Sequence, residues 1–225
     1  MKANDSKVVT INPLNIQIVK LRIVGDSPLL VHKWSEKSKK EMLDAMMNKG
    51  VKVKGKARPA KDPVAEFIDS IYWICGAPTE KTMEGFEEAI ANGAKFGFPV
   101  TAIKQAVTSG AYRAGWIKDK VSLKGAFFIE SDAPDMLAEI KGSTPVMSEE
   151  PVRVGNGAAD LRYRGLFKNW YMDLRIRYNA SGLYTLENIV NAFNYGGFSC
   201  GIGEWRTEKN GQYGSFHVQP DAYGM

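Results

Sequence analysis

Cysteine and histidine are scarce in this chain of 225 residues, and long apolar runs are missing. Two cysteines, Cys75 and Cys200, and two histidines far apart in sequence indicate neither a disulfide framework nor a structural zinc site. The N-terminal residues MKANDSKVV lack the apolar core of a signal peptide, and no run approaches the ~18 apolar residues of a membrane span. We therefore expect an intracellular protein that does not enter a membrane.

A nucleotide cofactor is not indicated either, although glycines gather near the C-terminus. In the stretch 192–218, the sequence Gly201-Ile-Gly203-Glu-Trp-Arg206 has arginine where a GxGxxG motif needs its third glycine, and no GK[ST] occurs. The stretch also follows an expected helix, whereas phosphate-binding loops follow a strand and open a helix. We expect no cofactor and no bound metal.

These glycines allow two interpretations. Residues without a Cβ let the backbone come close to a ligand, and exposed amides in such a loop can bind the phosphates of a polymer. Alternatively, the stretch is a helix C-cap followed by a bulged hairpin. The glycines considered as ligand contacts are Gly196, Gly197, Gly201 and Gly203.

Positive charge is concentrated in one segment. Residues 33–61 contain ten lysines and arginines and three acids, a net charge of +7, whereas the whole chain has a net charge of +5. Such a run is either a solvated, flexible loop or an insertion that contacts nucleic acid. The residues within it that we expect to contact phosphates are Lys52, Lys54, Lys56 and Arg58.

The order of apolar patterns predicts an α+β protein. Its core elements run strand, helix, strand, strand, helix, strand, at 15–24, 101–114, 123–141, 161–178, 185–195 and 213–218. This order favours a ferredoxin-like (RRM-like) core, a split βαβ arrangement with an antiparallel sheet and helices on one face. A single domain would span 1–225, with a basic insertion at 33–61, a helical one at 62–95 and an extended one at 142–160.

Local signals place some boundaries. Asp62, followed by proline, and Thr185 are expected helix N-caps. The sequence Phe-Gly-Phe-Pro at 96–99 is expected to form a turn.

Three stretches carry a resemblance to a known family. They are LRIVGDSPLL at 21–30, a strand followed by a Ser-Pro turn; FPVTAIKQAVTSGAYR at 98–113, which leads into a helix; and the glycine-rich stretch 196–216, which follows a second helix. In this order they resemble the RAMP superfamily, the repeat-associated proteins of CRISPR effector complexes. The resemblance covers the core and not the insertions.

The resemblance implies an RRM-like core that binds single-stranded RNA or DNA, closest to the backbone subunit that polymerises along a CRISPR guide RNA. It also implies a head-to-tail homo-oligomer, other CRISPR or phage proteins as further partners, and the cytoplasm of a bacterial or phage-infected cell as location. Unlike charges favour such an oligomer, because the segment 33–61 is basic whereas a helix elsewhere is surrounded by Glu80, Glu84, Glu87 and Glu88. The remaining expected contacts with the strand are Lys104, Arg113, Arg162, Arg164 and Arg206.

Two other functions stay open. A metal-independent endoribonuclease of the RAMP type would need a general acid or base, for which His32, just past the first strand, is the candidate. The simpler interpretation of His32 is a hydrogen-bonded turn residue. The other alternative is a phage protein that acts in DNA recombination or interferes with host defence by protein contacts. No Ser-His-Asp or Cys-His arrangement is evident, so we expect a binding protein and not an enzyme.

Overall fold

Helices and antiparallel sheets make up an α+β protein in the computed structural model, which describes residues 13–34, 36–47, 60–154 and 158–220. Four residues of the basic insertion lie outside these described residues: Lys52, Lys54, Lys56 and Arg58.

The larger sheet has the strand order β10-β1-β9-β6-β4-β3, and all its pairings are antiparallel. β5 pairs with one end of β9 and β6 with the other, so that β5 and β6 form one interrupted strand beside β9. The strands are β1 (Ile16–Gly25), β3 (Trp73–Cys75), β4 (Lys95–Pro99), β5 (Phe127–Glu130), β6 (Leu137–Gly142), β9 (Trp170–Asn179) and β10 (Phe216–Val218).

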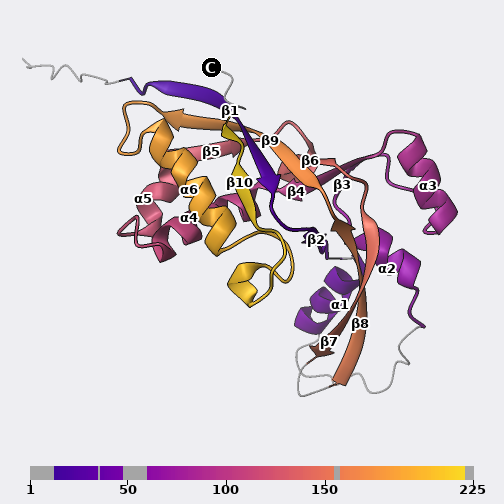
Figure 1. The fold of residues 1–225 in the computed structure, drawn as a ribbon. Helices are drawn as coiled ribbons and strands as arrows, with labels where there is room; N and C mark the ends of the chain where they lie inside the picture. Colours follow the sequence, from indigo (N-terminus) through magenta and orange to yellow (C-terminus); the bar gives the residue numbers. More distant parts are fainter. Residues whose placement is uncertain (1–12, 35, 48–59, 155–157, 221–225) are drawn as a thin grey trace, which may run out of the picture.

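Helices cover one face of this sheet: α4 (Val100–Arg113) and α6 (Leu186–Ser199), with α5 (Lys120–Ala126) beside them (Figure 1). Alternate residues of the central strands point toward these helices and are almost fully buried, because a pleated strand presents every second side chain to one face. They include Leu21, Ile23, Met172 and Leu174. Burial of this apolar face is the main force that holds the core together.

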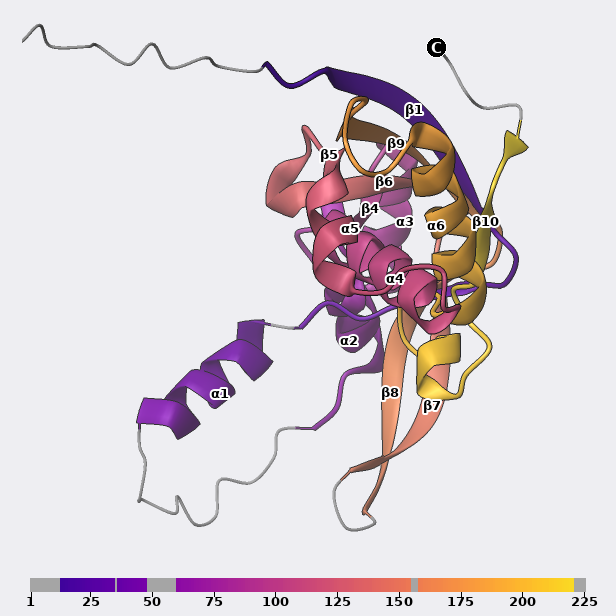
Figure 2. The ribbon, with the colours of Figure 1, turned by 90° about the vertical axis from the view of Figure 1, so that its left-hand side faces the viewer.

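A smaller sheet has the order β2-β8-β7. Its strands are β2 (Leu29–Val31), β7 (Val146–Val154) and β8 (Ala158–Phe167), and α2 (Pro63–Ser70) packs against β8. β7 and β8 form a long hairpin that extends away from the larger sheet (Figures 1 and 2). The insertion expected at 142–160 is therefore mostly one arm of this hairpin.

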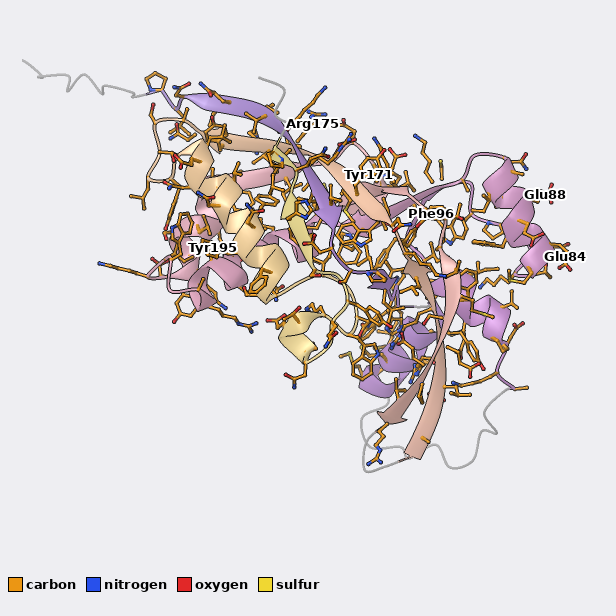
Figure 3. The ribbon with its side chains drawn as sticks, viewed as in Figure 1. Glu84, Glu88, Phe96, Tyr171, Arg175 and Tyr195 are labelled. Atoms are coloured by element: carbon orange, nitrogen blue, oxygen red, sulfur yellow. The ribbon has the colours of Figure 1, made fainter. Side chains whose placement is uncertain are left out.

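Two helices lie at the periphery. Figure 2 shows α1 (Glu36–Met47) apart from both sheets, and its exposed apolar residues are Met42, Leu43, Met46 and Met47. α3 (Met83–Ala91) lies at the end of the molecule opposite α5 and α6, with Glu84 and Glu88 on its outer side (Figures 1 and 3). Within the described ranges, no helix is both long enough and apolar enough to cross a membrane.

The structure corrects several expected boundaries. Residues 123–126, expected in a strand, belong to helix α5, and residues 96–99, expected as a turn, lie in β4. Within the core element expected at 161–178, the strands predicted at 161–164 and 170–178 correspond to β8 and β9, but these two strands belong to different sheets. Asp62 and Thr185 are helix N-caps, as predicted, and Thr185 belongs to a capping box.

Candidate nucleic-acid interface

The glycine-rich segment after α6 folds back onto the turn between β1 and β2. The backbone amide of Glu204 donates to the carbonyl of Leu30 at 2.9 Å, and the amide of Gly214 donates to the carbonyl of Pro28 at 2.8 Å. At the same turn, the hydroxyls of Ser27 and Ser215 lie 2.8 Å apart. Two of the three stretches that resemble the RAMP superfamily are thus in direct contact.

Glycines allow this segment to fold tightly. Gly201 and Gly203 have φ of 67° and 82°, a region that residues with a Cβ rarely adopt. A Cβ at Gly203 would also lie 2.4 Å from the carbonyl oxygen of Leu30. Several amides expected to face a ligand are already used in the fold, among them those of Gly201, Ile202 and Glu204.

Gly196 and Gly197 were expected in the loop after the helix, but this prediction is wrong. Both glycines are buried in the last turns of α6. The helix continues because these glycines permit close packing. A Cβ at Gly196 would lie 2.6 Å from the Cα of Val107 in α4, and one at Gly197 would lie 1.8 Å from the carbonyl oxygen of Phe216 in β10. Close packing therefore explains why glycine is needed at both positions. The sequence pattern alone did not distinguish this role from ligand binding.

A cavity of about 180 Å³ lies between the glycine-rich segment, the start of α4 and the residues after β2. His32 is in its wall, with Nδ1 at 3.4 Å from Oε1 of Glu204, and the hydroxyl of Tyr72 donates to the carbonyl of His32 at 3.3 Å. The stretch 98–113 contributes Phe98, Ala102, Gln105 and Ala106. Two of the three stretches that resemble the RAMP superfamily thus line the cavity, and the third, 21–30, is hydrogen-bonded to its wall through Leu30 and Glu204.

The cavity has defined protonation states. The hydrogen bond with His32 lowers the pKa of Glu204, and the positive charge of Arg164 acts in the same direction, while partial burial opposes both. Burial raises the pKa of Tyr72, and the nearby charge of Glu204 raises it further. At neutral pH the site therefore combines an ionised carboxylate, Glu204, and a protonated phenol, Tyr72.

Arg206 and Arg113 share one carboxylate at the edge of this cavity. Arg113 Nη2 donates to Glu208 Oε1 at 2.7 Å, and Arg206 Nε donates to Glu208 Oε2 at 3.0 Å. Arg206 Nη1 also donates to the carbonyl of Gly203 at 3.0 Å. Burial raises the pKa of Glu208, but the hydrogen bonds and charges of the two arginines outweigh it and lower the pKa.

A buried ion pair lies at the base of the hairpin. Arg164 and Glu150 are 7% and 8% exposed, and Arg164 Nη1 donates to Glu150 Oε2 at 2.8 Å. The indole Nε1 of Trp205 donates to the same oxygen at 2.9 Å. Beside them on β8, Arg162 Nε lies 2.9 Å from Asp160 Oδ2. The two arginines expected on β8 are therefore adjacent, one buried and one half-exposed.

The basic segment 33–61 begins beside the cavity and ends on the β7–β8 hairpin. The amide of Lys33 donates to the carbonyl of Ser70 at 2.8 Å, directly after His32 in the cavity wall. At the other end, Lys61 Nζ lies 2.5 Å from Asp160 Oδ1 and also contacts the carbonyl of Leu161 on β8. The segment thus leaves the core beside the cavity and returns to it on the hairpin.

The sheet face opposite α4 and α6 is an alternative surface, but its cations are paired with carboxylates. Arg22 and Lys141 both bind Asp173, at 2.6 and 3.0 Å, and Arg22 also lies 4.5 Å from the centre of the Tyr171 ring. Arg175 binds Glu130 and Asp132 (Figure 3). Arg175 is therefore matched by carboxylates, whereas the Arg22–Lys141–Asp173 cluster keeps an excess of one positive charge.

Lys104 lies away from the cavity, at the edge of the larger sheet. Its Nζ is 4.4 Å from the centre of the Phe128 ring and 5.3 Å from that of Phe127. Burial lowers its pKa, and the nearby charge of Arg177 lowers it further. Lys104 is therefore separate from the other expected contacts that the structure describes, namely Arg113, Arg162, Arg164, Gly201, Gly203 and Arg206.

Sequence reasoning did not single out four residues that complete the site: Tyr72, Glu150, Glu204 and Trp205. Glu204 and Trp205 lie within the glycine-rich stretch, where interleaved charges and aromatics were a usable signal. Glu150 has no such signal, because its partners Arg164 and Trp205 are distant in sequence.

Comparisons with known proteins do not identify a family: no family model matches the chain, and a search of curated proteins finds no match. Among the described residues, no group of three or more histidines, cysteines, aspartates and glutamates is arranged to hold a metal ion.

Proposed function

We propose that this protein binds single-stranded nucleic acid, RNA or DNA, and assembles along the strand in the manner of a CRISPR backbone subunit. One observation carries the proposal: two of the three stretches that resemble the RAMP superfamily line one cavity, the third is hydrogen-bonded to its wall through Leu30, and the basic segment 33–61 begins beside this cavity and ends on the β7–β8 hairpin. A segment with a net charge of +7 is thereby tethered at the site. Polyanion binding is the use to which such a charge is best suited.

The charges of the described residues support the same function. Arg113 and Arg206 share the single carboxylate of Glu208, and Lys61 and Arg162 share that of Asp160. The first cluster holds two cations and one anion, so it keeps an excess of one positive charge. In the second, Lys61 Nζ also lies 3.8 Å from Glu66 Oε1, so two cations face two anions. Phosphate oxygens can bind these guanidinium and ammonium groups without displacing the carboxylate that orients them.

We further propose that the core is ferredoxin-like, or RRM-like. β1, α4, the interrupted strand β5/β6, β9, α6 and β10 follow the expected order of elements, and β10, β1, β9 and β5/β6 are adjacent and antiparallel. The close contact between α4 and α6 on one face is in keeping with a split βαβ core. β3, β4 and the β7–β8 hairpin are then additions to that core.

The binding test is fluorescence anisotropy of a labelled single strand of about 30 nucleotides at low salt, with matched RNA and DNA in competition. We expect saturable binding with little dependence on sequence, since phosphate contacts dominate. Failure of both strands to bind would refute the proposal.

Assembly along the strand is proposed to be head-to-tail. Glu84, Glu87 and Glu88 are exposed on α3. At the opposite end of the molecule, Lys124 is exposed on α5 and Lys118 is exposed just before this helix. Opposite charges at opposite ends favour a heterologous contact that does not close. Light scattering should show a mass that grows with strand length, for example from about 20 to about 60 nucleotides. A fixed one-to-one complex on both lengths would refute the assembly.

A metal-independent endoribonuclease is the second candidate, favoured by the contact between His32 and Glu204 in the cavity. Glu204 faces Nδ1 of the imidazole, so Nε2 would be the atom that takes a proton from a 2′-hydroxyl. His217 is a matched control, because its Nδ1 lies 2.6 Å from Asp26 on the surface. For an enzyme, His32→Ala abolishes cleavage of a labelled RNA and His217→Ala does not. Intact RNA with the wild-type protein would exclude this candidate.

A further inference from the structure

A groove lies beside the cavity, on the other side of the segment 203–206. It is shallow and open to solvent, has a volume of about 320 Å³, and is lined by Glu150, Pro151, Trp205, Gly211, Gln212 and Tyr213. Glu204 and Arg206 line the cavity, whereas Trp205 between them lines the groove. The groove therefore has aromatic and apolar walls, a carboxylate that is already bound, and one amide side chain.

The backbone of Trp205 adopts a conformation that bulky residues rarely adopt. Its φ is 49°, in the left-handed region. Two hydrogen bonds hold it there: Nε1 donates to Glu150, and the carbonyl oxygen accepts from the amide of Tyr213 at 3.0 Å. Gly211 leaves room for that carbonyl because it has no Cβ. A Cβ at Gly211 would lie 1.6 Å from the same oxygen. Backbone strain of this kind is concentrated at functional sites.

The strain is not explained by burial of the indole, because Trp205 remains 42% exposed. The hydrogen bond to the buried Glu150 fixes the plane of the ring, and Tyr213 lies in the same groove. A fixed, half-exposed indole is suited to stacking against a flat partner at a low cost in conformational entropy.

We propose that this groove stacks one base of the bound single strand against Trp205. The proposal rests on the proposed function and adds a base contact to its phosphate contacts. The open groove has room for a nucleobase, and stacking is tolerant of sequence because every base has a flat aromatic face.

Charge on both sides of the groove favours a nucleic acid over an uncharged ligand. Arg153 lies two residues after Pro151 on one wall, and Lys209 lies two residues before Gly211 on the other. Both are exposed, and neither forms an ion pair with any residue that the structure describes. Phosphates on either side of a stacked base would meet these two cations.

The experiment measures affinity for a labelled single strand with the full-length protein and two variants of similarly exposed aromatics. Trp205→Ala should weaken binding about 5- to 150-fold, the usual effect of losing one stacked base. Phe128→Ala is the matched control, since Phe128 is 45% exposed on the sheet face opposite α4 and α6. It should bind as the wild type does. An effect of Phe128→Ala with none of Trp205→Ala would place the strand on the sheet face and overturn the proposal.

Trp205→Phe guards against a folding defect, because it keeps an aromatic ring and loses only the indole hydrogen bond. It should retain most of the affinity, and it should lose the quenching of tryptophan emission that we expect when the wild-type protein binds the strand. The wild type should bind a strand with abasic sites more weakly than an intact strand. Trp205→Ala should bind the two strands with equal affinity.

The outcomes distinguish a failure of the stacking proposal from a failure of the proposed function. No binding of any strand to the wild type refutes the proposed function. Strand binding that is equal for the wild type and Trp205→Ala refutes only the groove. A proline-rich peptide that quenches Trp205 while the strand does not would show the groove to be a peptide site, and would also overturn the inference.

Discussion

Replacement of the buried Arg164–Glu150 pair tests how the hairpin is attached to the site. Both residues are less than one tenth exposed, and Arg164 Nε has no hydrogen-bond partner among the described residues. The pair is therefore sensitive to loss of either member, because the charge that remains is buried and uncompensated.

The two single replacements should differ in a definite order. After Arg164→Met, the carboxylate of Glu150 keeps the N–H of Trp205 at 2.9 Å and the hydroxyl of Ser148 at 3.3 Å, so we expect a loss of about 3 kcal/mol in the free energy of unfolding. After Glu150→Leu, Arg164 has no carboxylate at Nη1 and an unpartnered Nε, so we expect about 5 kcal/mol.

The double replacement should return close to the wild type, because no buried charge remains and two apolar side chains of suitable size fill the space. Urea unfolding of the four proteins measures this cycle. Arg175→Met is the control: Arg175 binds Glu130 and Asp132 on the surface, so its replacement should cost less than about 1 kcal/mol. Additive losses in the double variant would refute the reasoning.

Two further predictions concern the core and the sheet face. Gly196→Val should destabilise the protein by about 1–3 kcal/mol or more, because its Cβ would lie 2.6 Å from the Cα of Val107, whereas Gly125→Ala, with no atom within 4 Å, should be neutral or stabilising in thermal unfolding. Hydrogen bonding to Arg22 lowers the pKa of Asp173, so this carboxylate stabilises the fold above its unfolded pKa of about 3.9 and loses that effect as pH falls through its folded pKa. Asp173→Asn should therefore reduce the fall of the melting temperature at acid pH, and an unchanged fall would contradict this assignment. Equal effects of the two glycine variants on thermal unfolding would contradict the packing argument.

Local signals in the sequence predicted much of the core. Thr185 and Asp62 are N-caps, as predicted, because the capping side chain and the following apolar pattern are both local signals. The strand predicted at 170–178, where apolar and polar residues alternate, corresponds to β9. Predictions failed where packing decided. Gly97 and Pro99 suggested a turn, yet a Cβ at Gly97 would lie 2.7 Å from the Cβ of Leu137, so the glycine serves close packing inside a sheet.

Short apolar runs were ambiguous for a physical reason. Residues 123–130 read as one strand, but Asp119 caps the amide of Ser122 and the first half becomes the end of a short helix. The same carboxyl side chain is compatible with a turn before a strand, so only the packing of Leu123 in the core decides between the two.

The site could be predicted only in part. The sequence pointed to Arg206 and to His32, and the structure brings both to one cavity. It did not point to the pairing of His32 with Glu204, which are 172 positions apart, or of Glu150 with Trp205, which are 55 apart. Such pairs follow from the way the glycine-rich segment returns to β2 and to the hairpin.

The salt dependence of single-strand binding tests the central proposal most directly. A labelled strand of about 30 nucleotides and its duplex are titrated with the wild-type protein at several salt concentrations. We expect the single strand to bind in preference to the duplex, with the logarithm of the affinity falling linearly with the logarithm of the salt concentration as phosphate contacts release counterions. Absence of single-strand binding at low salt, or binding that does not change with salt, would contradict the account.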